Sequence, residues 1–499
     1  MSRIFGFLRE MLMATALGTG PVADVFQVAF RFPNTFRRLF AEGALNAAFV
    51  PLFSGHLQED IKSARQFSEE VFSVLFSILL FLTLIMELSM PFLVSYVIAP
   101  GFVKDMSKFE ATVRLAAIMF PYLPCMSFAA MMGGMLNALR HYFAAAIAPV
   151  FLNVILIAVL AYAWLTKLDV WHTGLALAWG VMLAGLIQLF IIWSAVRNVG
   201  IRISLVFPRL TVNVRRLCVL AFPAAITGGI TQINLLLNTN IASEEAGAIS
   251  SLVYADRLYQ LPLAVVGITV GTVLLPELSR ALRSGNRTES HDIQNRSFEF
   301  SLLLSLPASI ALLVMSNPMV RILLEHGQFN AQSTLKVSSL LALYGLGLPA
   351  FVLIKTLIPG FFAREDTTTP MIFAMISVFV NIALAKTLFP YFSVKGIVIA
   401  EISAGWSNAI LLFLALVRLG HWKGDILVIK RMLAYLMSAF VMAVALLVCE
   451  DRFSYSLSAM ASHAIQIAST VFMIFFAVAV YFGMVFLTTR GVRLFFPDI

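Results

Sequence analysis

Four long stretches of this chain carry no aspartate, glutamate, lysine or arginine: 143–166, 170–196, 217–243 and 453–489. A helix of about 20 mostly apolar residues is long enough to cross a bilayer. Lipid offers no hydrogen-bonding partners, so a spanning segment must satisfy its own backbone, as a helix does. The chain is also 60% hydrophobic and 12% charged, against roughly 45–50% and 25% in soluble domains. The sequence therefore predicts an all-α polytopic membrane protein.

Apolar stretches between polar breaks predict about fourteen transmembrane helices. Their approximate bounds are 3–20, 23–54, 71–98, 113–138, 143–166, 172–196, 215–241, 246–280, 298–323, 334–362, 369–389, 395–417, 431–449 and 463–489.

Basic residues are distributed unevenly among the predicted loops. If the N-terminus is cytoplasmic, the cytoplasmic loops contain most of them, including Lys62, Arg65, Arg140, Arg197, Arg202, Arg209, Arg283 and Arg418. The opposite side contains chiefly Lys104, Lys108, Arg114, Lys167, Lys395 and Arg452. Because cytoplasmic loops are enriched in lysine and arginine, we expect both termini in the cytoplasm. Charges in the first apolar stretch argue against a cleavable signal peptide.

A faint duplication relates the two halves of the chain. Pro51 pairs with Pro276, Gly101 with Gly327, and Asn153 with Asn381, at nearly constant offsets. Chance placement of such residues at helix ends is the alternative. Two facing repeats with the substrate site between them are a common transporter plan. We therefore predict two six-helix lobes, 1–197 and 198–418, followed by two extra helices in 419–499.

Several function classes are disfavoured by what the sequence lacks. It has no H-E-x-x-H motif, phosphate-binding G-x-x-x-x-G-K-[ST] motif or Cys/His cluster, so neither a metal site nor a cofactor is expected. The three cysteines, Cys125, Cys218 and Cys449, are far apart in apolar runs and predict core residues without a disulfide. The net charge of +9 fits anionic lipid and basic loops. We expect no nucleic-acid partner.

Charged residues are concentrated in the first predicted span. Arg3, Arg9 and Glu10 all lie there, although a charge at bilayer depth costs roughly 2.5–3.5 kcal/mol on insertion scales. A guanidinium binds phosphate oxygens bidentately and stays charged. Arg9 is the stronger candidate for a phosphate site, with Glu10 holding it between substrates, because Arg3 could also be a snorkelling anchor at the membrane surface.

The second predicted span contains a proline followed by further charges. Pro33 should break or kink this span and push Phe32 out of helical geometry. Arg38 and Glu42, four residues apart, can pair as structural support, which leaves Arg37 for a ligand or for the opposite lobe. In the first half of the same span Asp24 is a further intramembrane carboxylate.

Two groups of polar residues mark the second lobe. Asp256 and Arg257 lie inside an apolar span, and adjacent residues do not face each other on a helix, so Arg257 is a candidate counterpart of Arg9 across a central cavity. Asn238, Asn381 and Glu401 could form a site for sodium or a proton, or an interhelical hydrogen-bond cluster.

Four segments together resemble one family. They are SRIFGFLRE, ADVFQVAFRFPNTFRRLFAEGALNAAFVPLFS, APGF and VYADRLYQLP. The chain resembles the MurJ/MviN family of lipid II flippases, in the multidrug/oligosaccharidyl-lipid/polysaccharide exporter superfamily, over essentially its whole length. The family's cavity arginines match Arg3, Arg9, Arg37 and Arg257, and its acidic partners match Glu10, Asp24 and Glu42. Glu10 stands where the family usually has aspartate, and relatives carry more residues ahead of the first motif, so the true start could lie upstream of Met1.

The resemblance implies a function and a substrate. The expected activity is translocation of lipid II, the undecaprenyl-diphosphate-linked peptidoglycan precursor, from the cytoplasmic to the periplasmic leaflet by alternating access. It implies a cationic cavity, and a groove made by the last two helices for the polyprenyl tail. Membrane lipids are expected partners, and cell-wall synthesis proteins are candidate partners. The alternatives are another exporter of the superfamily for polysaccharide-lipid or cationic drugs, an enzyme acting on polyprenyl lipids, and a non-transporting scaffold.

Overall fold

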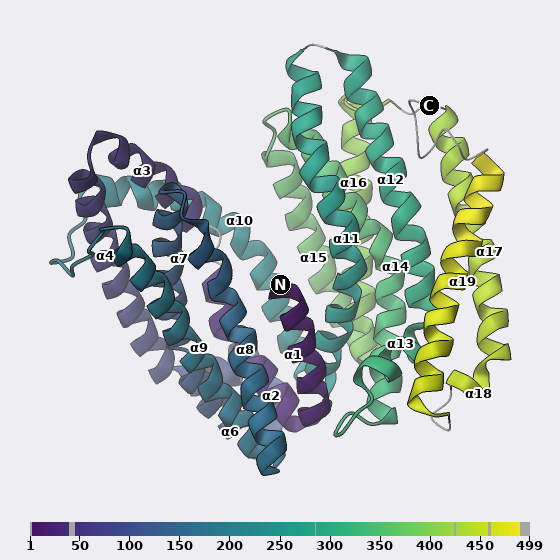
Figure 1. The fold of residues 1–499 in the computed structure, drawn as a ribbon, viewed down its shortest axis with the longest axis horizontal. Coiled ribbons are helices and arrows are strands. Elements are labelled where there is room, and N and C mark those ends of the chain that lie inside the picture. The colour runs from purple at the N-terminus through teal and green to yellow at the C-terminus, as the bar shows by residue number, and fades with distance from the viewer. Residues whose placement is uncertain (1, 39–44, 285, 424–425, 458–460, 490–499) are drawn as a thin grey trace. The chain divides into compact units, whose positions relative to one another are not determined.

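A computed structural model describes residues 2–38, 45–284, 286–423, 426–457 and 461–489, which form helices and no strand (Figure 1). Ten helical segments in this part of the chain are long and apolar enough to cross a membrane. The predicted all-α polytopic fold is therefore confirmed, although the count of fourteen spans is not. The four other predicted spans correspond to α1, to α2 with α3, to α10 and to α11.

The chain forms two compact units. The first comprises Met1–Ser250 together with His326–Phe329. Its helices are α1 (Ser2–Leu17), α2 (Pro21–Arg37), α3 (Leu45–Glu59), α4 (Ile61–Leu88), α5 (Met90–Phe92), α6 (Met106–Met119), α7 (Tyr122–Ala138), α8 (Tyr142–Thr166), α9 (Val170–Asn198) and α10 (Val212–Ala242), with the π-helix η2 (Leu93–Ile98) and the 3₁₀-helix η3 (Pro100–Lys104) between α5 and α6. In this unit α1 packs against α8 and α9, and α2 packs against α6, α7 and α9.

The second unit comprises Ser251–Glu325 and Asn330–Ile499. Its helices are α11 (Ala248–Arg283), whose first turn belongs to the first unit, α12 (Arg287–Val314), α13 (Ser316–Leu324), α14 (Ala331–Phe362), α15 (Thr368–Phe392), α16 (Val394–Arg418), α17 (Ile426–Arg452), α18 (Ser454–Leu457) and α19 (His463–Thr489). The two C-terminal helices, α17 and α19, pack against each other and against α12 (Figure 1). The predicted duplication and lobe boundaries stay predictions, and α10 packs within the first unit.

Two predicted spans are each divided into two helices, and in one of them a proline lies at the division. The predicted span 113–138 is two helices, because α6 ends at Met119 and Pro121 precedes α7. The predicted span 298–323 is likewise divided at Met315 between α12 and α13. Proline has no amide hydrogen and disfavours helical geometry in the residue before it. Met106–Ala138 is nonetheless one segment long and apolar enough to cross a membrane, so the predicted span 113–138 is confirmed as a segment of two helices, whereas the candidate span that begins at Thr288 ends at Val314.

At Pro33 the predicted break is wrong. The helix α2 continues through this residue to Arg37, with Phe32 buried inside it. Pro33 offers no amide hydrogen to the Ala29 carbonyl, and prolines inside membrane helices are tolerated when neighbouring groups or local adjustments satisfy such a freed carbonyl. Packing of Phe32 against Phe120, with ring centroids 5.6 Å apart, also holds α2 in place.

Candidate functional site

The first span buries an arginine beside a glutamate. Arg9 is 7% exposed and Glu10 4% exposed, and the Arg9 Nη2 donates to Glu10 Oε1. Adjacent residues point in different directions on a helix, but the long arginine side chain reaches its neighbour. The Nε of Arg9 has no hydrogen-bond partner. A buried donor that lacks a partner costs free energy, so Arg9 keeps capacity to bind an oxygen-rich group.

A second carboxylate, Asp24 in α2, is completely buried in a set of four donors. Its Oδ2 accepts from the Gly247 amide at 2.7 Å and from Lys108 Nζ at 3.3 Å. Its Oδ1 accepts from the amide and hydroxyl of Ser250 at 3.0 and 2.8 Å. These amides lie at the N-terminus of α11, where unpaired N–H groups and the helix dipole favour an anion. Asp24 therefore ties α2 to α6 and to the start of α11.

Lys108 reaches Asp24 because the start of α6 is capped. The Asp105 carboxylate accepts from the amides of Ser107 and Lys108 and from the Ser107 hydroxyl at 2.7 Å. The hydroxyl bond in particular lowers the pKa of Asp105. The Lys108 ammonium also lies 4.3 Å from the centroid of the Phe102 ring, a cation–π distance. The pattern of basic residues predicted Lys108 only as a loop residue, whereas in the structure it is 6% exposed.

Glycines permit a close backbone junction at the end of α1. The segment His326–Phe329 docks there, and the Gln328 amide donates to the Thr15 carbonyl at 2.9 Å. Gly18 and Gly327 have φ angles of 60° and 59°. A Cβ on Gly18 would lie 2.5 Å from the Gln328 carbonyl oxygen, and one on Gly327 would lie 2.5 Å from that of Thr15. Only glycine combines this conformation with such an approach.

Gly327→Ala is expected to lower the melting temperature of the purified protein by several degrees, because alanine adds both strain at positive φ and a backbone clash. Gly420→Ala is the matched control, since Gly420 has a φ of 67° and open space around its Cβ position. The measurement is thermal unfolding in detergent, followed by intrinsic fluorescence. Equal shifts for the two variants would show that the close approach contributes nothing.

The arginines of α2 have contacts within the first unit. Arg31 Nη1 donates to Thr239 Oγ1 in α10 at 2.5 Å. Arg37 Nε donates to Asn34 Oδ1 at 2.9 Å, and its role as a ligand-binding residue stays a prediction. Arg38 is exposed. The predicted Arg38–Glu42 pair is not described because Glu42 lies outside the described residues, as does the side chain of Arg3.

The polar groups of the second unit divide into two sets. Asp256 accepts from Gln260 Nε2 at 2.5 Å, one turn further along α11, and its neighbour Arg257 is half-buried. Glu401 in α16 accepts from the Tyr344 hydroxyl in α14 at 2.7 Å, and Tyr344 stacks on Tyr259 with ring centroids 5.1 Å apart. An interhelical hydrogen bond is thus one role of Glu401.

The remaining members of the predicted ion site are both buried. Asn381 in α15 is 1% exposed and belongs to the same unit as Glu401, whereas Asn238 in α10 is 3% exposed and belongs to the first unit. Across the described residues, no three His, Cys, Asp or Glu side chains gather as metal ligands. The ion site stays a prediction.

The fold is similar to the folds of solved membrane transporters. A solved inward-facing multidrug-resistance transporter of the MATE family, in the MOP superfamily, matches with a TM-score of 0.68 at 14% identity, over 84% of this chain and 94% of that one. A solved structure described as lipid II flippase MurJ in an inward closed conformation matches with a TM-score of 0.79 at 24% identity, over 97% of both chains. At these identities the matches establish the fold alone.

The sequence comparisons establish the family. The family model described as lipid II flippase MurJ matches residues 13–468. A probable lipid II flippase MurJ of Rhizobium meliloti (strain 1021) is 63% identical over 97% of this chain and 91% of that protein. The lipid II flippase MurJ of Burkholderia cenocepacia is 31% identical over 97% of this chain and 94% of that protein. The chain belongs to the MurJ family, as its resemblance implied, and it is a multi-pass membrane protein.

Proposed function

We infer that this protein is a transporter that moves lipid II across the membrane, from the cytoplasmic to the periplasmic leaflet, for peptidoglycan synthesis. The observation that carries this inference is family membership over residues 13–468, with relatives named as lipid II flippases. The family is one of flippases, so the protein is not an enzyme. We place it in the inner membrane of a bacterium.

The physical task explains the buried arginines. A diphosphate cannot cross hydrocarbon unaided, because an isolated ion in a low-dielectric medium costs tens of kcal/mol by Born estimates. Guanidinium groups can replace its hydration while the polyprenyl tail stays in lipid. We propose that Arg9 and Arg257 contact the diphosphate, supported by their positions within predicted membrane spans and by the unpartnered Nε of Arg9. We further propose that two lobes alternate and that the last two helices accommodate the tail.

The rival exporters are less well supported. The MATE-like fold alone would also fit a drug/cation antiporter. Cationic drugs, however, would be repelled by arginines in the transport path. We propose no cofactor, and the candidate site at Asn238, Asn381 and Glu401 remains one way in which an ion could reset the transporter. Cell-wall synthesis proteins remain candidate partners.

The proposed function is tested by depleting the protein in its host while a leaflet-specific probe reports lipid-linked precursor. Precursor should accumulate on the cytoplasmic face and fall on the periplasmic face, and re-expression of the wild-type chain should reverse both changes. Unchanged periplasmic precursor in depleted cells would refute the flippase assignment. A new lipid product formed by the purified protein would indicate an enzyme instead.

The proposed orientation predicts a labelling pattern. Ser107, Ser204 and Ser284 are all exposed, so cysteines placed there should react when a reagent reaches them. In intact spheroplasts an impermeant thiol reagent should label Ser107→Cys and should leave Ser204→Cys and Ser284→Cys unlabelled until the membrane is permeabilised.

The background for this experiment must lack Cys218. That residue is exposed, contrary to its prediction as a core residue, whereas Cys125 is buried. A buried thiol is shielded from the reagent and is therefore less reactive. The reversed labelling pattern would overturn the orientation, and with it the direction of export.

A further inference from the structure

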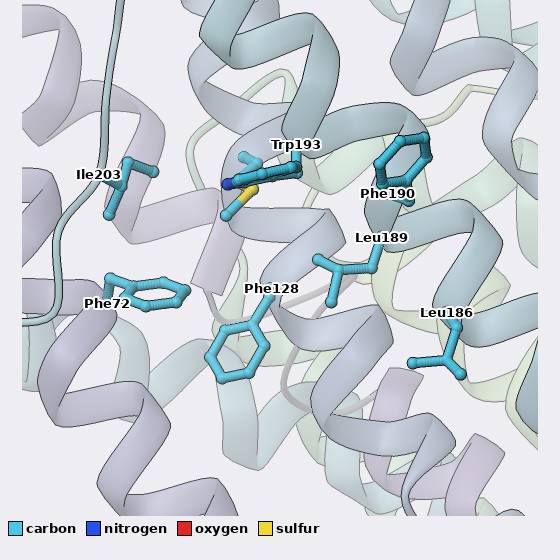
Figure 2. A pocket seen from close by; sticks show the side chains of 8 residues that line it. Phe72, Phe128, Leu186, Leu189, Phe190, Trp193 and Ile203 are labelled. Carbon is cyan, nitrogen blue, oxygen red and sulfur yellow. The ribbon is translucent and has the colours of Figure 1, made fainter.

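An apolar pocket of about 300 Å³ lies in the first unit, apart from the charged residues described above. Its walls come from three helices and one loop, with Phe72 from α4, Phe128 from α7, Phe190 and Trp193 from α9, and Ile203 from the loop after α9 (Figure 2). Its volume is at the lower end of the range for ligand pockets. Pockets lined in this way bind the apolar part of a ligand and leave its polar part at the rim.

The pocket is open along α9. Leu186, Phe190 and Trp193 follow one another at intervals of three or four residues, and their exposed fractions are 48%, 63% and 36%. Arg197 continues this stripe one turn further on, at the end of the helix, and its guanidinium lies 4.8 Å from the centroid of the Trp193 ring. The stripe thus runs from a cation at the helix end to apolar side chains deeper along the helix.

The loop after α9 is fixed in place as one wall of the pocket. The Ser204 amide donates to Glu69 Oε1 at 3.0 Å, and the Val206 amide donates to Ser73 Oγ at 2.9 Å. Arg202 is exposed beside the pocket-lining Ile203. The loop therefore adds a second cation at the same end of α9 and holds the pocket wall against α4.

Nearby carboxylates are already engaged. Glu69 also accepts from Arg65 Nε at 3.0 Å, and Glu70 accepts from the Thr211 hydroxyl at 2.7 Å and from Gln66. Among the described residues no carboxylate forms an ion pair with Arg197. The open end of the pocket is therefore cationic, which suits an anionic headgroup.

The length of the stripe indicates which kind of lipid fits it. From Arg197 to Leu186 is eleven residues, or about 16 Å along a helix, which is close to half of the roughly 30 Å hydrocarbon core. This distance matches one acyl chain of one leaflet and is too short for a polyprenyl tail. We propose that this pocket binds an anionic glycerophospholipid, with an acyl chain against Phe190 and Leu186 and its phosphate at Arg197 and Arg202.

The test uses the full-length protein in nanodiscs that contain phosphatidylglycerol with a photoreactive acyl chain, followed by peptide mapping of the cross-links. Cross-links should concentrate on residues 186–203. Leu186→Trp should reduce them about fivefold by filling the pocket mouth, and Arg197→Gln should reduce them about fivefold, the effect expected for one basic residue near an anionic lipid. A photoreactive phosphatidylcholine should label the pocket less and should not respond to Arg197→Gln.

Two matched controls lie on α16. Leu414→Trp changes a leucine that is also 48% exposed, and Arg418→Gln removes an exposed arginine from the last turn of that helix. Both should leave cross-links on residues 186–203 within twofold of wild type. Equal losses in variants and controls would overturn the proposal. The cross-linking is repeated with unlabelled competitors. If an undecaprenyl diphosphate lipid reduces the cross-links and unlabelled phosphatidylglycerol does not, the pocket binds the transported lipid. If inorganic pyrophosphate reduces them, the pocket is only an anion site.

Discussion

Replacing either Arg9 or Arg257 by alanine is expected to abolish growth of a strain depleted of its own flippase, while the variant still accumulates in the membrane. Both arginines lie inside apolar helices, where an uncompensated cation is costly unless it serves a ligand or a partner. Arg→Lys should rescue growth poorly, because lysine lacks the planar fork that binds two phosphate oxygens. Complementation and periplasmic exposure of precursor are measured together.

Arg9 requires an additional control, since its removal leaves Glu10 buried without its cation. Breaking a buried pair by removing one partner can cost 3–5 kcal/mol, so Arg9→Ala could fail by unfolding. The double variant Arg9→Ala/Glu10→Ala removes both charges and should accumulate at least as well as Arg9→Ala, without restoring transport. Recovery of growth in the double variant would mean that Arg9 only neutralises Glu10. Full growth of both single alanine variants would refute the phosphate-binding role.

Asp24→Ala is expected to lower the free energy of unfolding of the purified protein by about 3–5 kcal/mol and to abolish complementation, because it removes the acceptor for a buried lysine and for the N-terminus of α11. Thermal unfolding in detergent provides the first measurement and growth of the depleted strain the second. Asp169→Ala is a suitable control. Asp169 also caps a helix with two backbone amides, at the start of α9, but it is exposed. It should have a much smaller effect.

Two further variants separate the contribution of the Asp24 charge from that of its hydrogen bonds. Asp24→Asn leaves Lys108 buried without an anion, whereas Asp24→Asn/Lys108→Met removes both charges and keeps similar volume. The double variant should therefore be more stable than Asp24→Asn alone. If Asp24→Asn is as stable as wild type, the carboxylate contributes through hydrogen bonds that an amide can replace. If the double variant is the less stable, the lysine stabilises the fold without its acid.

Local chemistry was enough to predict the class of protein and part of the charged site. A long apolar run in lipid forms a helix, because a helix makes its backbone hydrogen bonds within the segment. Most spans could therefore be located from composition and length. The Arg9–Glu10 pair could be anticipated because adjacent residues stay close in any helix that forms. The α6–α7 division could also have been found, since Pro121 follows directly on the end of the first helix.

Interactions between distant residues depended on the tertiary structure. Asp24 and Gly247 are 223 positions apart, and Lys108 approaches them only because α6 packs against α2. The sequence nonetheless contained an indication of this site. Gly247 and Ser250 lie at the start of a helix whose first turn has no acidic residue of its own, so its amides can bind a carboxylate from elsewhere in the chain. Local rules also predicted a break at Pro33, whereas α2 stays helical there and packs Phe32 against Phe120.

The sequence by itself determined that the chain crosses the membrane as helices, because in hydrocarbon the backbone must form its hydrogen bonds within the segment. It also determined that the first span carries an arginine with a specific role, because a charge in hydrocarbon is costly. The tertiary structure alone decided which groups neutralise Asp24, that His326–Phe329 docks on the end of α1, and that α4, α7 and α9 enclose an apolar pocket. These contacts depend on how helices pack, and the apolar periodicity of a single span does not specify which neighbour it meets or at what depth.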